Sequence, residues 1–215
     1  LAIVPQAKQL VRVIRWFLGE AVYRLLDEGY TRFIDFASGL PTEDHIHQIA
    51  PKGTKVIYSD IDPVTVAYAQ EIIKDQPDVR YFECDVRTPE KLLSLSNVEN
   101  LIGRDRKVAL GLNGIAWFIT DEELESCLNV LYDWADTGTK LFISVGDFSL
   151  SQDSELAKGS FSFYEKVGQP VFHRDEQTCM KLIGKWKIEE PGFIPLEDWI
   201  GIEELKKRTE EENLQ

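Results

Sequence analysis

The sequence has no long hydrophobic run. No window approaches the roughly 20 apolar residues that a helix needs to cross a bilayer. The first ten residues, LAIVPQAKQL, also lack the basic start and the apolar stretch of a secretory signal peptide. These absences argue against a membrane-spanning or secreted protein. We therefore expect a cytoplasmic protein without a membrane partner.

Cysteine and histidine are scarce, with three residues of each. Cys84, Cys127 and Cys179 are odd in number and far apart, so they form neither a disulfide framework nor a CxxC metal motif. His45 and His47 are two residues apart on an expected helix, where their side chains would point about 200° apart. We therefore expect reduced, structural thiols and no metal site.

Basic residues are outnumbered. The chain has 24 Lys and Arg against 37 Asp and Glu, which gives a formal net charge of -13. A partner that is held through phosphates needs Lys and Arg to neutralise them, so we do not expect nucleic acid as a partner. The acidity itself is explained by solubility and does not identify a partner.

Glycine is sparse where a phosphate-binding loop would need it. The stretch FIDFASGLPTED, residues 33–44, runs from a predicted buried strand to the opening of a predicted helix. It has only Gly39 where a dinucleotide-binding GxGxxG would have three glycines, and it lacks the GK[ST] of a P-loop. Glu43 and Asp44 are expected in the first helical turn, where they would repel a phosphate. The turn favours a ligand without phosphates.

Apolar strands and amphipathic helices alternate along the chain. Its 215 residues, 43% hydrophobic, suit one α/β domain. Apolar residues at helical spacing between Leu10 and Leu26 predict a helix that Gly29 caps. Strands are predicted in RFIDF, KVIYSD, VRYFECD, KVALGLN, TKLFISVGDF, KWKIEE and FIPL. Strands that alternate with helices predict parallel βαβ units. The fold class is therefore α/β, with a Rossmann-like, doubly wound, mostly parallel sheet and helices on both faces.

Helix starts and domain limits can also be predicted. Asp62 before Pro63 and Thr88 before Pro89 are typical of N-caps, and Thr120 with Glu123 forms a capping box. Further helices are expected over 151–167 and 175–184. We divide the chain into an N-terminal helix packed on the domain at 1–30, the main domain at 31–200, and a charged helix or tail at 201–215.

Acidic residues stand at the ends of the first three predicted strands. Ligands of open α/β sheets bind outside these carboxyl ends, where the strand order reverses. Asp60 lies 21 residues beyond Gly39, the spacing of a ribose-binding acid, and Asp85 could accept a hydrogen bond from an adenine amino group. Each acid alone is explained equally well as a surface carboxylate. Together with Asp35 they favour a cationic ligand that contains adenosine.

Several motifs together resemble a known family. They are GLPT at Gly39 to Thr42, His47, YSDIDP at Tyr58 to Pro63, and PGFIPLEDW at Pro191 to Trp199. The sequence resembles the class I S-adenosylmethionine-dependent methyltransferases, and more narrowly a bacterial group, frequent in actinomycetes, with the pattern GLPT…DP…PG…P…W. The helix IRWFLGEAVYRLL resembles that group's N-terminal helix, so the likeness covers nearly the whole chain.

The resemblance implies a seven-stranded sheet that binds S-adenosylmethionine. Its first turn would hold the methionine part, Asp60 the ribose, and Asp85 with Val86 the adenine, while Asn113 would face the sulfonium. The resemblance and the strand ends together predict a cofactor site formed by Asp35, Ala37, Ser38, Gly39, Thr42, His47, Asp60, Ile61, Asp85, Val86 and Asn113. Ala37 replaces the usual first glycine of the turn, which is compatible with a backbone φ below zero there.

The function that we predict is methyl transfer from S-adenosylmethionine to a small-molecule acceptor. No catalytic residue is assigned, because alignment alone can account for much of the rate when the sulfonium supplies the leaving group. His173 is either a general base or an exposed residue, and His47 either contacts the cofactor or is a polar residue on a helix surface. The alternatives are a cofactor-binding sensor of the same fold without turnover and, less favoured, a nucleotide-dependent oxidoreductase.

The segment 147–170 carries the aromatic residues Phe148, Phe161, Phe163 and Tyr164 among polar ones. An amphipathic helix with its aromatic side chains in the core explains this pattern. A lid over an acceptor pocket, formed with Asn113, Trp117 and His173, explains it almost as well. The sequence predicts neither the acceptor nor the oligomeric state.

Overall fold

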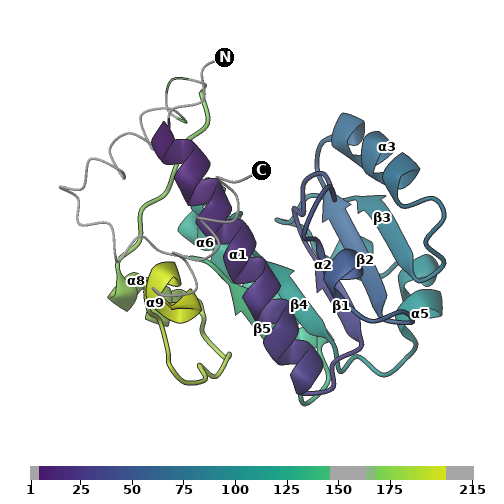
Figure 1. Ribbon diagram of the computed structural model, residues 1–215. Coiled ribbons are helices and arrows are strands. Elements are labelled where there is room, and N and C mark those ends of the chain that lie inside the picture. Colours follow the sequence, from purple (N-terminus) through teal and green to yellow (C-terminus); the bar gives the residue numbers. More distant parts are fainter. Residues whose placement is uncertain (1–4, 146–163, 165, 167, 202–215) are drawn as a thin grey trace.

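A five-stranded parallel sheet forms the centre of the molecule (Figure 1). The computed structural model describes residues 5–145, 164, 166 and 168–201. The strand order is β3-β2-β1-β4-β5, and each neighbouring pair is parallel. The strands are β1 (Arg32–Asp35), β2 (Lys55–Asp60), β3 (Val79–Glu83), β4 (Ala109–Leu112) and β5 (Lys140–Ile143). The order reverses between β1 and β4, which places the ligand crevice of such a sheet at their carboxyl ends.

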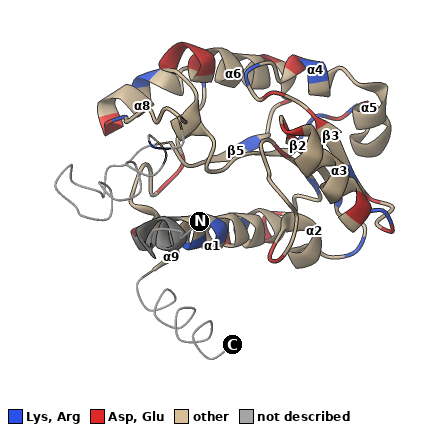
Figure 2. Ribbon diagram, turned by 90° about the horizontal axis from the view of Figure 1, so that it is seen from above, with Lys and Arg blue, Asp and Glu red and all other residues tan. Residues whose placement is uncertain are grey.

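Helices cover both faces of the sheet, and Figure 2 shows the two layers. The apolar side chains of α1 (Pro5–Asp27), α2 (Ile46–Ile49) and α3 (Pro63–Ile72) share one core cluster with Phe33 and Val56. The opposite face packs Ile34 and Leu110 against α4 (Glu90–Leu93), α5 (Ser96–Ile102), α6 (Asp121–Trp134) and α8 (Glu176–Leu182). The doubly wound α/β prediction is therefore confirmed.

The chain closes with α9 (Leu196–Ile200), which packs on α1. The Trp199 ring meets Phe17 edge to face, with 5.0 Å between the ring centroids. The Arg24 guanidinium lies 3.7 Å from the centroid of the same ring, close enough for a cation–π contact. The late PGFIPLEDW motif thus ends against the N-terminal helix.

Most predicted helix ends are confirmed. Gly29, at φ +87°, closes α1 in a Schellman motif in which Tyr30 N–H donates to the Leu25 carbonyl. The Asp62 carboxylate caps α3 by accepting from the N–H groups of Val64 and Thr65. Thr120 caps α6 and forms the predicted capping box.

One predicted cap is wrong. The N-cap of α4 is Pro89 rather than Thr88, so the helix begins one residue later than expected. The Thr88 hydroxyl donates to the Asp85 carbonyl at 3.4 Å, which keeps this side chain in the preceding turn.

The number of strands was also predicted wrongly. Residues 185–190 and 193–195 are irregular, and α9 begins at Leu196, so the part of the chain that the structure describes has five strands rather than seven. Trp186 explains the first difference, because its indole N–H donates to the Leu128 carbonyl of α6 at 3.0 Å. The segment is anchored on a helix rather than paired with β5. The predicted helix at 151–167 falls almost entirely outside the described residues, as does the tail from residue 202.

Arg174 is a buried charge that fastens the C-terminal part of the chain to the turn after β4. Its side chain is fully buried. Nη1 and Nη2 donate to the carbonyls of Ala116 and Ile119, both at 2.6 Å, and Nε donates to Asp121 Oδ1 at 2.7 Å. Every guanidinium nitrogen therefore has an acceptor, and one acceptor is a carboxylate, as a buried charge requires.

The substitution Arg174→Met should lower the free energy of unfolding by about 2–4 kcal/mol, because two buried carbonyls lose their donors at roughly 1–3 kcal/mol each. Urea denaturation measures the change. Lys185→Met is the control, since it removes an exposed ion pair with Asp133 and an exposed cation–π contact with Tyr132, and it should cost about 1 kcal/mol. Equal losses in the two variants would contradict the role assigned to Arg174.

Candidate functional site

The predicted site residues of the first two strands meet at the carboxyl edge of the sheet. Asp35 and Asp60 are the last residues of β1 and β2. The turn after β1 folds back onto the end of β2, where Ser38 N–H donates to the Ser59 carbonyl at 2.8 Å. The Gly39 N–H then donates to Asp60 Oδ2 at 3.1 Å. The GLPT turn and the acid 21 residues beyond Gly39 are therefore in direct contact.

The Asp60 carboxylate is held in a fixed orientation. Oδ2 accepts from Gly39 N–H, and Oδ1 accepts from Asp62 N–H at 2.9 Å. Each carboxylate oxygen can accept two hydrogen bonds, so each keeps one lone pair for a ligand. Asp62 itself is occupied in capping α3, as the sequence predicted. Two free acceptor positions at a strand end suit a pair of neighbouring hydroxyl groups.

Asp35 is an acid buried beneath the turn. It is 3% exposed, and its Oδ1 has no hydrogen-bond partner among the described residues. Burial raises the pKa of its carboxyl to about 7. In the sheet register Asp35 lies between Tyr58 and Gly111. A Cβ at Gly111 would lie 2.4 Å from Asp35 Oδ1, so glycine is needed there to leave room for the carboxyl group.

An aromatic pair continues this row across the sheet. Tyr58 and Tyr81 are paired in the β2–β3 register, and their rings lie 5.8 Å apart. The Tyr58 hydroxyl accepts from His47 N–H at 3.0 Å and lies 3.0 Å from the ring Nδ1 of the same residue. The Tyr81 hydroxyl donates to the Gly39 carbonyl at 2.7 Å. His47 therefore holds the Tyr58 hydroxyl, and Tyr81 holds the turn at Gly39.

The backbone of the turn differs from expectation. Ala37 has φ +53° rather than the negative value that we expected, a left-handed conformation that costs an L-residue about 1–2 kcal/mol. Asp44 is likewise at φ +59°. Glu43 and Asp44 precede α2 instead of lying in its first turn, because His45 is the N-cap and its N–H donates to Gln48 Oε1 at 3.1 Å. Contacts with Asp60 and Tyr81, together with Gly39 at φ +65°, hold the turn in its shape.

Other predicted residues are already engaged with the protein. The Asp85 carboxylate binds the Arg87 guanidinium, with Nη2 at 2.6 Å, and this arginine lowers the pKa of Asp85. Asn113 Nδ2 donates to the Ile14 carbonyl at 3.0 Å, and its Oδ1 accepts from the Ser144 hydroxyl at 3.1 Å. Asn113 thus fastens α1 to the carboxyl edge.

The remaining predicted residues differ in exposure. Ile61 is 55% exposed beside Asp60, whereas Val86 is 5% exposed in the core. Thr42 is exposed, and its carbonyl accepts from Gln48 Nε2 at 2.6 Å. Of these three, Ile61 has the apolar surface most open to a ligand.

Aromatic side chains lie along the turn after β4. Trp117 and Phe118 belong to the short helix η1 (Ala116–Phe118), and Trp117 is 8% exposed with no acceptor for its Nε1–H among the described residues. Phe118 meets Tyr164 edge to face, with 4.9 Å between the ring centroids. His173 is exposed. Apart from Tyr164, the aromatic residues of the expected lid at 147–170 lie outside the described residues.

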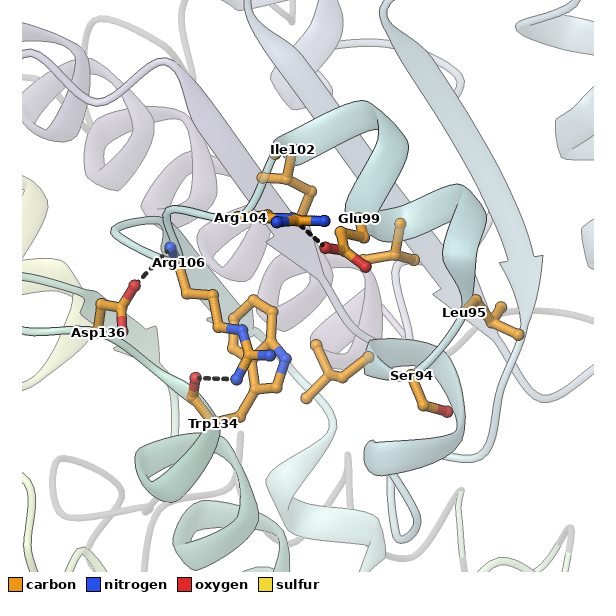
Figure 3. Close-up of a pocket in the computed structure, with 11 residues that line it drawn as sticks. Ser94, Leu95, Glu99, Ile102, Arg104, Arg106, Trp134 and Asp136 are labelled. Atoms are coloured by element: carbon orange, nitrogen blue, oxygen red, sulfur yellow. Dashed lines mark hydrogen bonds and ion pairs between the residues drawn. The ribbon is translucent and has the colours of Figure 1, made fainter.

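A cavity of about 360 Å³ lies elsewhere (Figure 3). It is bordered by α5, by the loop that leads into β4, and by the loop between α6 and β5, so it lies at the amino ends of β4 and β5. Its arginines are engaged: Arg104 Nε donates to Glu99 at 3.2 Å, and Arg106 Nη1 donates to the Trp134 carbonyl at 3.2 Å. Because the cavity lies at the amino ends of the strands, it is separate from the crevice predicted at their carboxyl ends.

The described residues contain no group of three or more His, Cys, Asp or Glu side chains that could hold a metal ion. None of the described helices is long and apolar enough to cross a membrane. All three cysteines are buried, and none of them forms a disulfide.

Solved structures resemble this fold. A proposed methyltransferase from Thermobifida fusca YX has a TM-score of 0.79 and 24% identity, covering 90% of this chain and 73% of its own. A DUF574 family protein from Streptomyces avermitilis has a TM-score of 0.76 and 24% identity, covering 87% and 74%. Magnesium protoporphyrin IX methyltransferase from Synechocystis, with bound S-adenosylhomocysteine, has a TM-score of 0.54 and 16% identity, covering 86% and 77%.

The family follows from the sequence comparison. No protein of curated function matches the chain. A family described as S-adenosyl methyltransferase matches all of residues 1–215. The chain belongs to this family, and it is a class I methyltransferase that uses S-adenosylmethionine as methyl donor.

Proposed function

We propose that S-adenosylmethionine binds across the carboxyl ends of β1, β2 and β3 and that its methyl group passes to a small-molecule acceptor. Asp60 holds the ribose, the turn at residues 36–45 holds the methionine part, and the adenine lies against Ile61 near Asp85 and Val86. The observation that carries this proposal is the Asp60 carboxylate, because two backbone N–H groups orient it and one lone pair of each oxygen is free.

The charges at this edge fit the cofactor. S-Adenosylmethionine carries two cationic groups, the sulfonium and the α-ammonium. Asp35 offers a buried carboxyl oxygen without a partner among the described residues, and an ammonium group would satisfy it. Two aspartates from neighbouring strands and the two acids of the turn make the edge acidic, which favours a cation and disfavours a phosphate.

The bound cofactor supplies the reactive methyl group and its own leaving group. What the protein contributes is orientation and the exclusion of water. The aromatic rings of Trp117, Phe118 and Tyr164 lie beside the end of β4, and we assign them to the wall of the acceptor pocket.

The first prediction concerns Asp60. Asp60→Asn should weaken binding of S-adenosylhomocysteine about 10- to 100-fold, because charge-assisted hydrogen bonds to the ribose are lost. Isothermal titration calorimetry measures the change. Asp62→Asn is the matched control, since it removes the same charge from the same loop while asparagine still caps α3. Similar losses in both variants would show that the general charge of the loop, and not Asp60, binds the ribose.

The second prediction concerns Asp35 and pH. The folded pKa of Asp35 is raised by burial, so the ligand-free protein binds a proton there that the unfolded chain does not bind between about pH 4 and 7. The free energy of unfolding should therefore fall as pH rises through this window, and it should fall less in Asp35→Asn. An ammonium ligand favours the carboxylate, so affinity for S-adenosylhomocysteine should rise from pH 5 to about 7 and then level off.

The pH profile of affinity, measured by calorimetry in wild type and in Asp35→Asn, tests this assignment. Burial lowers the pKa of His45, whose ring lies against Tyr58, to about 4, so this ring is mostly neutral from pH 5 to 7 and does not produce the rise. A profile that is equally steep in Asp35→Asn would assign the titration to another group and remove Asp35 from the site.

The third prediction concerns the acceptor. With methyl-labelled S-adenosylmethionine, label should pass to at least one compound in a panel of small hydroxyls, amines and carboxylates, and not to RNA or DNA. The formal charge of -13 is the reason, because it opposes a polyanionic substrate. Label that appears only in nucleic acid would overturn the proposed acceptor class and leave the cofactor site untouched.

A further inference from the structure

The two peptide groups that flank Gly39 are each held by a side chain. Its N–H donates to Asp60 Oδ2 at 3.1 Å, and its carbonyl accepts from the Tyr81 hydroxyl at 2.7 Å. Tyr81 is 3% exposed, and its ring lies against Tyr58. The hydroxyl is therefore fixed by packing in the sheet, two strands away from the turn that it contacts. Gly39 has φ +65°, so these two hydrogen bonds fix a residue whose backbone would otherwise be free to rotate.

The hydrogen bond from Tyr81 to the Gly39 carbonyl also orients the next backbone donor, the Leu40 N–H. A trans peptide is planar, so the Leu40 N–H points in the direction opposite to the Gly39 carbonyl. Because that carbonyl is bound to Tyr81, the Leu40 N–H is directed away from the Tyr81 hydroxyl. Among the residues that the structure describes, none accepts a hydrogen bond from this N–H. Leu40 is 42% exposed, which leaves the outer side of the turn open to a ligand.

The turn offers an anion no cationic side chain of its own. Residues 33–51 contain no Lys or Arg, whereas Glu43 and Asp44 are acidic. Burial lowers the pKa of both His45 and His47, which keeps these rings neutral at physiological pH. The methionine part of the cofactor nevertheless carries a carboxylate. The charge of Arg15 in α1 acts on His45, and a backbone N–H of the turn is a further donor that such a group can use.

We propose that Tyr81 is a positioning residue for the cofactor, because it aims the Leu40 N–H at the carboxylate of the methionine part. This inference rests on the proposed site at the carboxyl ends of β1 to β3. Tyr81 touches no reacting atom and acts only through the peptide group between Gly39 and Leu40. The Tyr81 hydroxyl and the Asp60 carboxylate together hold the backbone on both sides of Gly39 in one conformation.

The substitution Tyr81→Phe keeps the ring and removes the hydroxyl. Affinity for S-adenosylhomocysteine should fall about three- to tenfold, the usual effect of one hydrogen bond. Affinity for decarboxylated S-adenosylhomocysteine, which has the same amine and adenosine but no carboxylate, should change by less than about twofold, because Tyr81 acts through a donor that only the carboxylate uses. Calorimetry with both ligands gives the ratio of the two affinities.

Tyr30→Phe is the matched control. Tyr30 is also buried and donates its hydroxyl to a backbone carbonyl, that of Gly138 at the amino end of β5, far from the turn. Its loss should leave both affinities unchanged. A Tyr81→Phe variant that loses affinity for both ligands equally, or for neither, would overturn the inference and assign the hydroxyl to the fold.

A measurement on the wild-type protein keeps the test decisive if Tyr81→Phe does not fold. Wild type should bind S-adenosylhomocysteine more tightly than the decarboxylated ligand, and equal affinities would overturn the inference because no donor would then serve the carboxylate. A wild-type protein that binds neither ligand would instead contradict the proposed cofactor site, so the two failures are distinguishable.

Discussion

The Asp60 carboxylate joins the two loops on which the site depends. It accepts one hydrogen bond from Gly39 in the turn after β1 and one from Asp62 at the start of α3. The turn therefore keeps its position although Ala37 is in a left-handed conformation. In the proposed binding mode this carboxylate serves structure and ligand together, because each of its oxygens keeps one lone pair beyond these two hydrogen bonds.

Much of the fold could be predicted because its signals are local. A short buried strand, a proline after an acidic cap, and Thr120 paired with Glu123 each determine structure within a few residues. The errors arose where distant contacts decide. KWKIEE resembles a strand, yet the Trp186 indole bonds to α6, and no periodicity in the sequence encodes that partner. The Thr88 hydroxyl likewise bonds to a carbonyl and not to the helix start.

The site shows the same division. Asp35, Gly39 and Asp60 were found from spacing and strand ends, and the structure brings them together. Tyr81 and Gly111 were missed, because their roles come from the strand register, which sets Tyr81 beside Tyr58 and Gly111 beside Asp35. The only sequence signals are a tyrosine in one predicted strand and a glycine near the end of another. The partners of the predicted Asn113 in α1 and β5 were not predictable either.

In the proposed binding mode the acidic edge suits a cationic ligand, which side-chain carboxylates and a few backbone donors can hold without a phosphate-binding motif. A crystal structure of the protein with S-adenosylhomocysteine tests this account most directly. The account predicts both ribose hydroxyls within hydrogen-bonding distance of Asp60 and the ligand's ammonium group near Asp35. A ligand whose ribose contacts neither oxygen of Asp60, or that occupies the cavity beside Trp134, would contradict it.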